Sequence, residues 1–421
     1  MTLFFPYDKI NLMKVLFVSN LSIGIGDENE KVELVQSRYL EKYKQNLLNT
    51  SQKDDWKYSG AGAKFQGLTP PSTYEIEASS YSINSVCPFD ETTYIYSATA
   101  KSLSTTVSAI IKKNHEDKSE QFLINRNKES IGSLDYDGGG RLAASVSDGD
   151  GAVKNIAILN LKNNDFYYLS GGDSIDDNPH FSKCKDKIYF DTRGIGRDND
   201  MQIVEYTNST ICAITGDRQF EEVLEESNFD VFCPKDDENG NLYYMKKPYK
   251  KTKRKGLFRS LLDVILIPFW LVYGLFKLLS FFAGVAKRSS KKTQDKGFGD
   301  NPVRPQNVSE RDLFIQNEMI NIEREEKKNA RKGDKNPGFA PRNIELWRID
   351  KGGNKARLAK GLLSYDIAEN GKIIYSNGRY CFVLETEKDE IKVLFKDKFI
   401  NKICLNSITA AKYKGRDPFN L

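Results

Sequence analysis

Histidines and paired cysteines are scarce in this 421-residue chain. It contains two histidines and six cysteines, and no two cysteines form a Cys-x-x-Cys pair. Transition metals are usually held by clusters of these side chains, so little material exists for such a metal site. No Gly-x-Ser-x-Gly motif occurs either, which excludes the nucleophile elbow of α/β-hydrolases. We therefore expect no metal, no cofactor and no catalytic residue that can be named from the sequence.

A secretion signal is also missing from the start of the chain. The N-terminus has no basic region, Pro6 and Asp8 interrupt it, and the apolar run Val15–Val18 is too short for a signal-peptide core. The cysteines stand singly in apolar, strand-like stretches. In a chain of this size, buried reduced thiols are the commoner interpretation. Both observations predict a cytoplasmic protein.

The chain has enough apolar and aromatic residues to fold. Hydrophobic residues make up 39% of it, with 21 tyrosines and 24 phenylalanines. Disordered chains are poor in aromatic residues, so global disorder is excluded. The length suits one large domain or two ordinary ones.

Positive charge is concentrated in one block. Between Lys246 and Lys296 there are 14 lysines and arginines and two aspartates, a local net charge of +12. Because the whole chain carries +5, the remainder carries −7. A nucleic-acid binder would be expected to have its basic surface on the folded body, so we expect no nucleic-acid partner.

One hairpin pattern recurs along the chain. An apolar stretch is followed by a turn rich in Asp, Asn, Gly or Lys and then by a second strand-like stretch. Six copies, the last of them weak, begin near Ile83, Ile131, Asn178, Phe229, Tyr365 and Ile400. Their turns lie 36 to 54 residues apart, except for one interval of 131, which becomes 37 if residues 250–343 are set aside. A period of about 40–50 residues is typical of four-stranded propeller blades, so we predict a mainly β fold, a β-propeller of six blades, with seven as the alternative.

One copy carries a more specific motif. Asp176-Asp-Asn-Pro-His-Phe-Ser, followed by Lys187-Ile-Tyr-Phe, resembles the repeat of TolB-like, WD40-like β-propellers. The resemblance spans roughly residues 80–250 and 343–412, although the motif is well formed in this copy only. It implies a closed ring used mainly for binding.

The repeats divide the chain into four parts. Residues 1–80 form an N-terminal segment with an amphipathic helix over 29–49, and residues 81–249 and 343–421 form the blades. Residues 250–342 form a helical insertion in one blade, in which Ser309-x-x-Asp312 is typical of a helix start and precedes a second helix that runs to about Lys332. Because the last repeat supplies only about two strands, we expect an N-terminal strand, either Val15–Val18 or Trp56–Phe65, to complete that blade.

The insertion predicts contact with a membrane. Its charge-free run between Asp263 and Lys277 has 13 residues, whereas a membrane-spanning helix needs about 20. On a helical wheel its polar residues form one narrow strip opposite a broad apolar face, which is typical of a helix lying in the interface. Lysines and arginines on both flanks favour an anionic surface. The predicted membrane-binding residues are Lys250, Lys251, Lys253, Arg254, Lys255, Leu257, Phe258, Leu262, Ile265, Phe269, Trp270, Phe276, Phe282, Lys287 and Arg288.

Two alternatives for the insertion stay open. Instead of lying in the membrane interface, it could form a helical hairpin packed on the propeller. It could also form a single membrane-spanning segment between two domains. Two further motifs are weak. Gly24-Ile-Gly26 lacks the third glycine of a dinucleotide site and is followed by acidic residues, and Asp148-Gly-Asp150 lacks the bidentate glutamate of a calcium loop.

The sequence thus predicts a binding or scaffolding module, peripheral or monotopic on the cytoplasmic face of the membrane. Its expected partners are an anionic membrane surface and a protein that the sequence does not identify. Two other function classes remain: an effector whose insertion perturbs the bilayer, and an enzyme with a site in the central pocket of the propeller.

Overall fold

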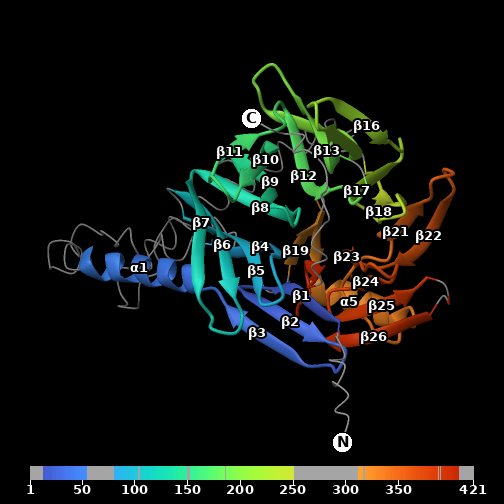
Figure 1. Ribbon diagram of the computed structural model, residues 1–421, viewed down its shortest axis with the longest axis horizontal. Coiled ribbons are helices and arrows are strands. Elements are labelled where there is room, and N and C mark those ends of the chain that lie inside the picture. Colours follow the sequence, from blue (N-terminus) through green and yellow to red (C-terminus); the bar gives the residue numbers. More distant parts are fainter. Residues whose placement is uncertain are drawn as a thin grey trace, which may run out of the picture. The chain divides into compact units, whose positions relative to one another are not determined.

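Antiparallel strands make up most of the chain in the computed structural model (Figure 1). The structure describes residues 13–54, 80–102, 105–148, 152–184, 186–250, 312–315, 318–386, 388 and 390–406. Residues 1–249 and 305–421 form one compact unit and residues 250–304 a second one. The description below concerns the first unit.

Four sheets of the described chain have four strands each, and every neighbouring pair in them is antiparallel. The first contains β27 (Ile403–Leu405), β1 (Lys14–Ser19), β2 (Ser22–Asp27) and β3 (Val32–Gln36), in this order. The second contains β4 (Ser80–Pro88), β5 (Thr93–Lys101), β6 (Thr106–Asn114) and β7 (Glu120–Asn127). The third contains β17 (Phe229–Asp236), β18 (Leu242–Pro248), β21 (Glu345–Ile349) and β22 (Lys355–Lys360). The fourth contains β23 (Ser364–Ile367), β24 (Ile373–Ser376), β25 (Tyr380–Glu385) and β26 (Glu390–Lys396).

A larger sheet of nine strands lies between the second and third sheets in the sequence. One half contains β8 (Glu129–Tyr136), β9 (Arg141–Asp148), β10 (Lys154–Asn160) and β11 (Phe166–Tyr168). The other half contains β12 (Ser174–Phe181), β13 (Lys187–Arg197), β15 (Thr210–Thr215) and β16 (Phe220–Leu224), with β14 (Ile203–Tyr206) paired to β13. A single parallel pair, Lys154 with Ile175, joins the halves. The repeated up-and-down sheets make this a β-propeller-like fold.

The strand β1 joins the two ends of the chain. It pairs with β27 through Val15 with Leu405, Leu16 with Cys404 and Phe17 with Ile403. The expected pairing of Val15–Val18 with the last repeat is confirmed, whereas Trp56–Phe65 lies outside the described residues. In Figure 1 the blue strands β1 and β2 accordingly lie beside the red strands of the C-terminal sheet.

Both faces of β1 are buried, which explains its unbroken apolar sequence. Val15 and Phe17 pack with Phe395 and other residues of the fourth sheet. Leu16 and Val18 pack on the opposite side with Tyr94 and other residues of the second sheet. The apolar core therefore consists of layers between neighbouring sheets.

Two short helices occur among the described residues, and both begin later than predicted. Residues Val32–Gln36, expected as helix, form β3, because this strand completes the first sheet by pairing with β2. The helix α1 (Arg38–Asp54) starts after Ser37, whose Oγ accepts a hydrogen bond from the Leu40 N–H and so caps the helix.

The second helix, α5 (Ile322–Arg331), was expected from Asp312. Residues 312–321 instead form the hairpin of β19 (Asp312–Ile315) and β20 (Glu318–Asn321). The side chain of Asn321 caps α5 by accepting from the Arg324 N–H. The segment that follows α5 packs on the propeller, where Ile322, Phe339, Ala340 and Leu363 form one apolar cluster.

Candidate functional site

The predicted membrane-binding residues lie almost wholly outside the described chain. Lys250 is described, and the other fourteen, from Lys251 to Arg288, fall outside the described residues. None of the described helices has the length and hydrophobicity that a membrane crossing requires. Among the described residues, the candidate site is a cavity in the propeller.

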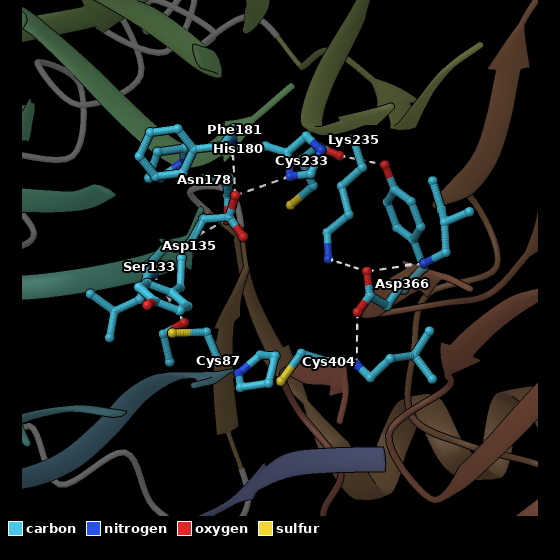
Figure 2. Close-up of a pocket in the computed structure, with 18 of the residues that line it drawn as sticks. Cys87, Ser133, Asp135, Asn178, His180, Phe181, Cys233, Lys235, Asp366 and Cys404 are labelled. Carbon is cyan, nitrogen blue, oxygen red and sulfur yellow. Dashed lines mark hydrogen bonds and ion pairs between the residues drawn. The ribbon is translucent and has the colours of Figure 1, made fainter. Parts of the chain in front are cut away.

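This cavity has a volume of about 600 Å³ and is lined by the first strand of every repeat. These strands are β4, β8, β12, β17, β23 and β27, and Figure 2 shows the side chains that they direct into the cavity. Each is followed by a tight turn into the next strand of its sheet, except β27, which pairs with β1.

One residue from each inner strand occupies the same structural position. In every repeat, this residue lies two positions before the residue whose backbone N–H donates a hydrogen bond to the next strand. Asp135, for example, lies two positions before Asp137, whose N–H donates to the Arg141 carbonyl. We call this set the first ring; it consists of Cys87, Asp135, His180, Lys235, Asp366 and Cys404. Its members form three kinds of neighbouring pair around the cavity (Figure 2).

The first pair is ionic and joins β17 to β23. Lys235 Nζ donates to Asp366 Oδ1 at 2.7 Å. Asp366 Oδ2 also accepts from the Leu405 N–H at 2.7 Å. Burial opposes the charging of both groups, but their mutual attraction outweighs it, so the pKa of Lys235 is raised and the pKa of Asp366 is lowered.

The second pair places His180 between two carboxylates. Its Nε2 lies 3.1 Å from Asp236 Oδ1, and its Nδ1 lies 3.2 Å from Asp135 Oδ2. Burial disfavours the imidazolium, but Asp135 and Asp236 more than offset this and raise the pKa of His180 to about 9. The imidazole is therefore a cation at neutral pH. The histidine of the TolB-like motif thus has an electrostatic role in the cavity.

The third pair consists of two thiols, Cys87 and Cys404. Both are buried, and burial raises the pKa of each well above its usual value. A thiol of high pKa is a poor nucleophile at neutral pH, so this pair does not resemble the thiolate of a cysteine enzyme. The described cysteines form no disulfide bond with one another, and Cys184 is the exposed one among them.

A second ring lies two residues earlier along each inner strand. Its members are mostly small and polar: Ser85, Ser133, Asn178, Cys233, Ser364 and Lys402. Lys402 Nζ donates to Asn178 Oδ1 at 2.9 Å, which links β27 to β12. Asn178 and Cys233 adopt left-handed backbone conformations, with φ of 51° and 53°, at irregularities in the strand register.

A buried carboxyl, Asp191, supports the second ring from behind. Its Oδ1 accepts from Asn178 Nδ2 at 2.8 Å and from the Cys233 N–H at 2.9 Å. Burial raises the pKa of Asp191 to about 7, and the nearby charge of Asp177 acts in the same direction. Asp177 itself is paired with Lys154 at 2.7 Å.

The turns at the other end of the cavity are more exposed and carry both signs of charge. Lys183, Glu238 and Glu369 line the cavity there. No group of three or more His, Cys, Asp or Glu side chains among the described residues is arranged to hold a metal ion.

The sequence pattern predicted the repeats but not the rings. Asp135, Lys235 and Asp366 are charged residues inside otherwise strand-like apolar stretches. This pattern was the sequence signal that could have indicated the first ring. Aligning the repeats on their turns would have placed all six positions in one register. Gly24 and Gly26 have a different explanation: they lie in β2, where a Cβ would meet the Phe17 ring at 2.1 Å and the Phe395 ring at 2.5 Å.

Comparison with known proteins yields fold similarity only. No family model and no curated protein matches the sequence. Among solved structures, TolB from Acinetobacter baumannii aligns with 94% of this chain and 67% of its own, at 8% identity and a TM-score of 0.43. The nidogen/laminin complex aligns over 94% and 98%, at 7% identity and a TM-score of 0.43. Tricorn protease aligns over 96% and 40%, at 11% identity and a TM-score of 0.36. The chain is a β-propeller with distant structural similarity to these proteins.

Proposed function

We propose that the chain is a six-bladed propeller of the TolB-like kind that acts as a binding or scaffolding module on the cytoplasmic face of a membrane. Six blades follow if the nine-stranded sheet is divided at its single parallel pair, Lys154 with Ile175. Each of the six inner strands then belongs to a blade of its own. The proposed partner is an anionic membrane surface, which the segment between β18 and β21 would contact.

The observation that carries the proposal is the pairing of β18 with β21. These strands are antiparallel neighbours from Leu242 with Ile349 to Lys246 with Glu345. The chain therefore leaves the propeller and returns to it at adjacent strands of one sheet. A propeller that stays on one side of a membrane is compatible with an insertion that lies on or dips into the bilayer, but not with a single complete crossing.

The C-terminal part of the insertion, which contains α5 and the residues that follow it, contacts the propeller. These residues are therefore left out of the proposed membrane-binding segment. Asn329 Nδ2 donates to the carbonyl oxygens of Gly338 and Ala340, and Arg379 forms an ion pair with Glu326 at 2.9 Å. Residues 251–311 therefore remain as the segment for the membrane. Their sequence combines the apolar face with the basic flanks, and each Lys or Arg near an anionic surface contributes about 1 kcal/mol.

Binding is favoured over catalysis by the chemistry of the cavity. The thiols that line it have raised pKa values, and the charged side chains Lys235, Asp366 and His180 are engaged with one another or with neighbouring residues. Such a site can recognise a ligand, but it does not present an activated nucleophile.

Deletion of residues 251–311 tests the proposal. Lys250 would be joined to Asp312 by a short Gly/Ser linker, which keeps β19, β20 and α5. We expect a folded propeller, with an unchanged circular dichroism spectrum, that no longer sediments with phosphatidylserine-containing vesicles. Full-length protein that stays soluble without detergent and ignores these vesicles would contradict membrane docking. Release of a trapped dye from the vesicles by the full-length protein would instead support a bilayer-perturbing effector.

A further inference from the structure

Lys402 in the second ring has spare hydrogen-bonding capacity. An ammonium group carries three donors. Among the described residues, the structure gives Lys402 Nζ one hydrogen-bond acceptor, the Oδ1 atom of Asn178, and no ion-pair partner. The nearby Asp177 is already paired with Lys154, and burial keeps much of Asp191 protonated near neutral pH. Lys402 therefore brings to the cavity a positive charge that Asp177, which it shares with Lys154, compensates only in part.

Two serine hydroxyls lie on the strands on either side of Lys402. Ser85 on β4 and Ser364 on β23 are 5% and 8% exposed. Ser85 Oγ accepts from the Leu134 N–H at 3.1 Å, and Ser364 Oγ accepts from the Ile403 N–H at 3.1 Å. Within the described part of the chain neither O–H has an acceptor, so both can donate into the cavity. This wall of the cavity thus combines one cation with two hydroxyl donors.

One carboxylate oxygen of the first ring also has hydrogen-bonding capacity to spare. Asp135 Oδ2 accepts from the Phe181 N–H and lies 3.2 Å from His180 Nδ1. Its Oδ1 is not used by any described residue, and the side chain is 26% exposed. A carboxylate oxygen can accept several hydrogen bonds. An acceptor for a ligand hydroxyl group therefore lies at this level of the cavity.

We infer that the central cavity binds a small hydroxylated organic anion. Its carboxylate or phosphate group contacts Lys402, Ser85 and Ser364, and one of its hydroxyl groups donates to Asp135. The cavity volume of about 600 Å³ falls within the range typical of small-molecule sites. This inference does not depend on membrane attachment.

Calorimetric titration of the full-length protein tests the inference. The probes are gluconate as a hydroxylated carboxylate, glycerol phosphate as a hydroxylated phosphate, and sorbitol as an uncharged polyol. We expect one of the two anions to bind with a Kd below about 1 mM and sorbitol not to bind. Whichever anion binds identifies the head group. Failure of both to bind at 10 mM, or equal binding of sorbitol, would overturn the inference.

Substitution of Lys402 locates the bound anion. Lys402→Gln should weaken binding at least about tenfold, since a hydrogen bond to a charged group is lost. The exposed Lys360→Gln on β22 makes the same charge change away from the cavity and should leave binding unchanged. If both variants bind as the wild type does, the anion is adventitious and the site is rejected.

Two further variants cover the case in which Lys402→Gln does not fold. Ser85→Ala and Ser364→Ala each remove one of the two hydroxyl donors and change no charge. Each variant should weaken the binding of the anion about threefold or more, since one hydrogen bond to it is lost. Unchanged binding in both variants would place the ligand elsewhere.

Discussion

Lys235 Nζ lies 2.7 Å from Asp366 Oδ1, although 131 positions separate these residues in the chain. Residues 251–311, which carry the basic and apolar sequence, fall between them. The ion pair joins the inner strand before the insertion to the inner strand that begins the next sheet. Two neighbouring sheets are thus linked at the wall of the cavity.

A double-mutant cycle measures how much this link contributes. For Lys235→Met and Asp366→Asn we expect a coupling free energy of about 1–2 kcal/mol in urea unfolding, because the side chains are 24% and 18% exposed and solvent screens the attraction in part. The matched control is Lys388 with Glu385, which lie 2.9 Å apart and of which Lys388 is 67% exposed. That pair should give about 0.5 kcal/mol or less. Equal coupling in the two pairs would show that burial does not strengthen the Lys235–Asp366 bond.

The protonation of His180 predicts a pH-dependent stability. The pKa of His180 is raised to about 9, so its contribution to the free energy of unfolding is complete below the unfolded pKa of about 6.5 and is lost as pH rises through 9. We expect on the order of 3 kcal/mol to be lost across this window. His180→Gln should remove this slope, while the titration of Asp191, between pH 4 and 7, remains in both proteins. A wild type and variant with parallel curves from pH 6.5 to 9 would contradict the raised pKa.

Closure of the ring depends on the aromatic side of β1. Phe17 is fully buried and stacks on Phe395 with the ring centroids 5.3 Å apart. Phe17→Ala should lower the free energy of unfolding by about 3–5 kcal/mol, because it removes a large side chain from a layer between two sheets. Leu34→Ala, in β3 of the same sheet but 49% exposed, should cost about 1 kcal/mol or less. Urea unfolding monitored by circular dichroism compares the two, and similar losses would mean that β1 is not a central strand of the core.

Two sets of substitutions in the insertion separate the forces that act on the membrane. Replacing the five basic residues from Lys250 to Lys255 with Gln should weaken binding to anionic vesicles and make the remaining binding less sensitive to salt. Replacing Phe269, Trp270 and Phe276 with Ser should also weaken binding to neutral vesicles, because the apolar contribution does not depend on lipid charge. Vesicle sedimentation at two salt concentrations, with anionic and with neutral vesicles, measures the strength of binding and its dependence on salt. If neither set changes sedimentation, residues 251–311 are not the membrane contact.

The repeat pattern was sufficient to predict the propeller, and it left two candidates, Val15–Val18 and Trp56–Phe65, for the strand that completes the last blade. Turn residues recur at blade spacing, and the unbroken apolar run Val15–Val18 indicates a strand buried on both faces. Both are local properties of the chain, so they can be read without coordinates. The apolar and basic character of residues 251–311 is equally a property of the sequence.

Two segments with helix-compatible sequence form strands instead. Val32–Gln36 pairs with β2 in a sheet that also contains β27 from the far end of the chain. No short window of sequence contains all the strands of that sheet, so tertiary pairing overrode propensity there. Asp312–Ile315 and Glu318–Asn321 pair with each other, so in this segment a local hairpin was taken for helix.

The cavity is the part that only the tertiary structure decided. A single inner strand contributes one residue to each ring, so Cys87, Asp135, His180, Lys235, Asp366 and Cys404 are unremarkable when taken alone. Ring closure brings them within a few ångströms, and burial then sets their charge, raising the pKa of the thiols while the neighbouring carboxylates keep His180 protonated. The sequence determined the blades and their order because these follow from local hydrogen bonding and apolar periodicity. The polar contacts of the cavity wall join residues up to 224 positions apart, as in Lys402 with Asn178, and they exist only once the ring is closed.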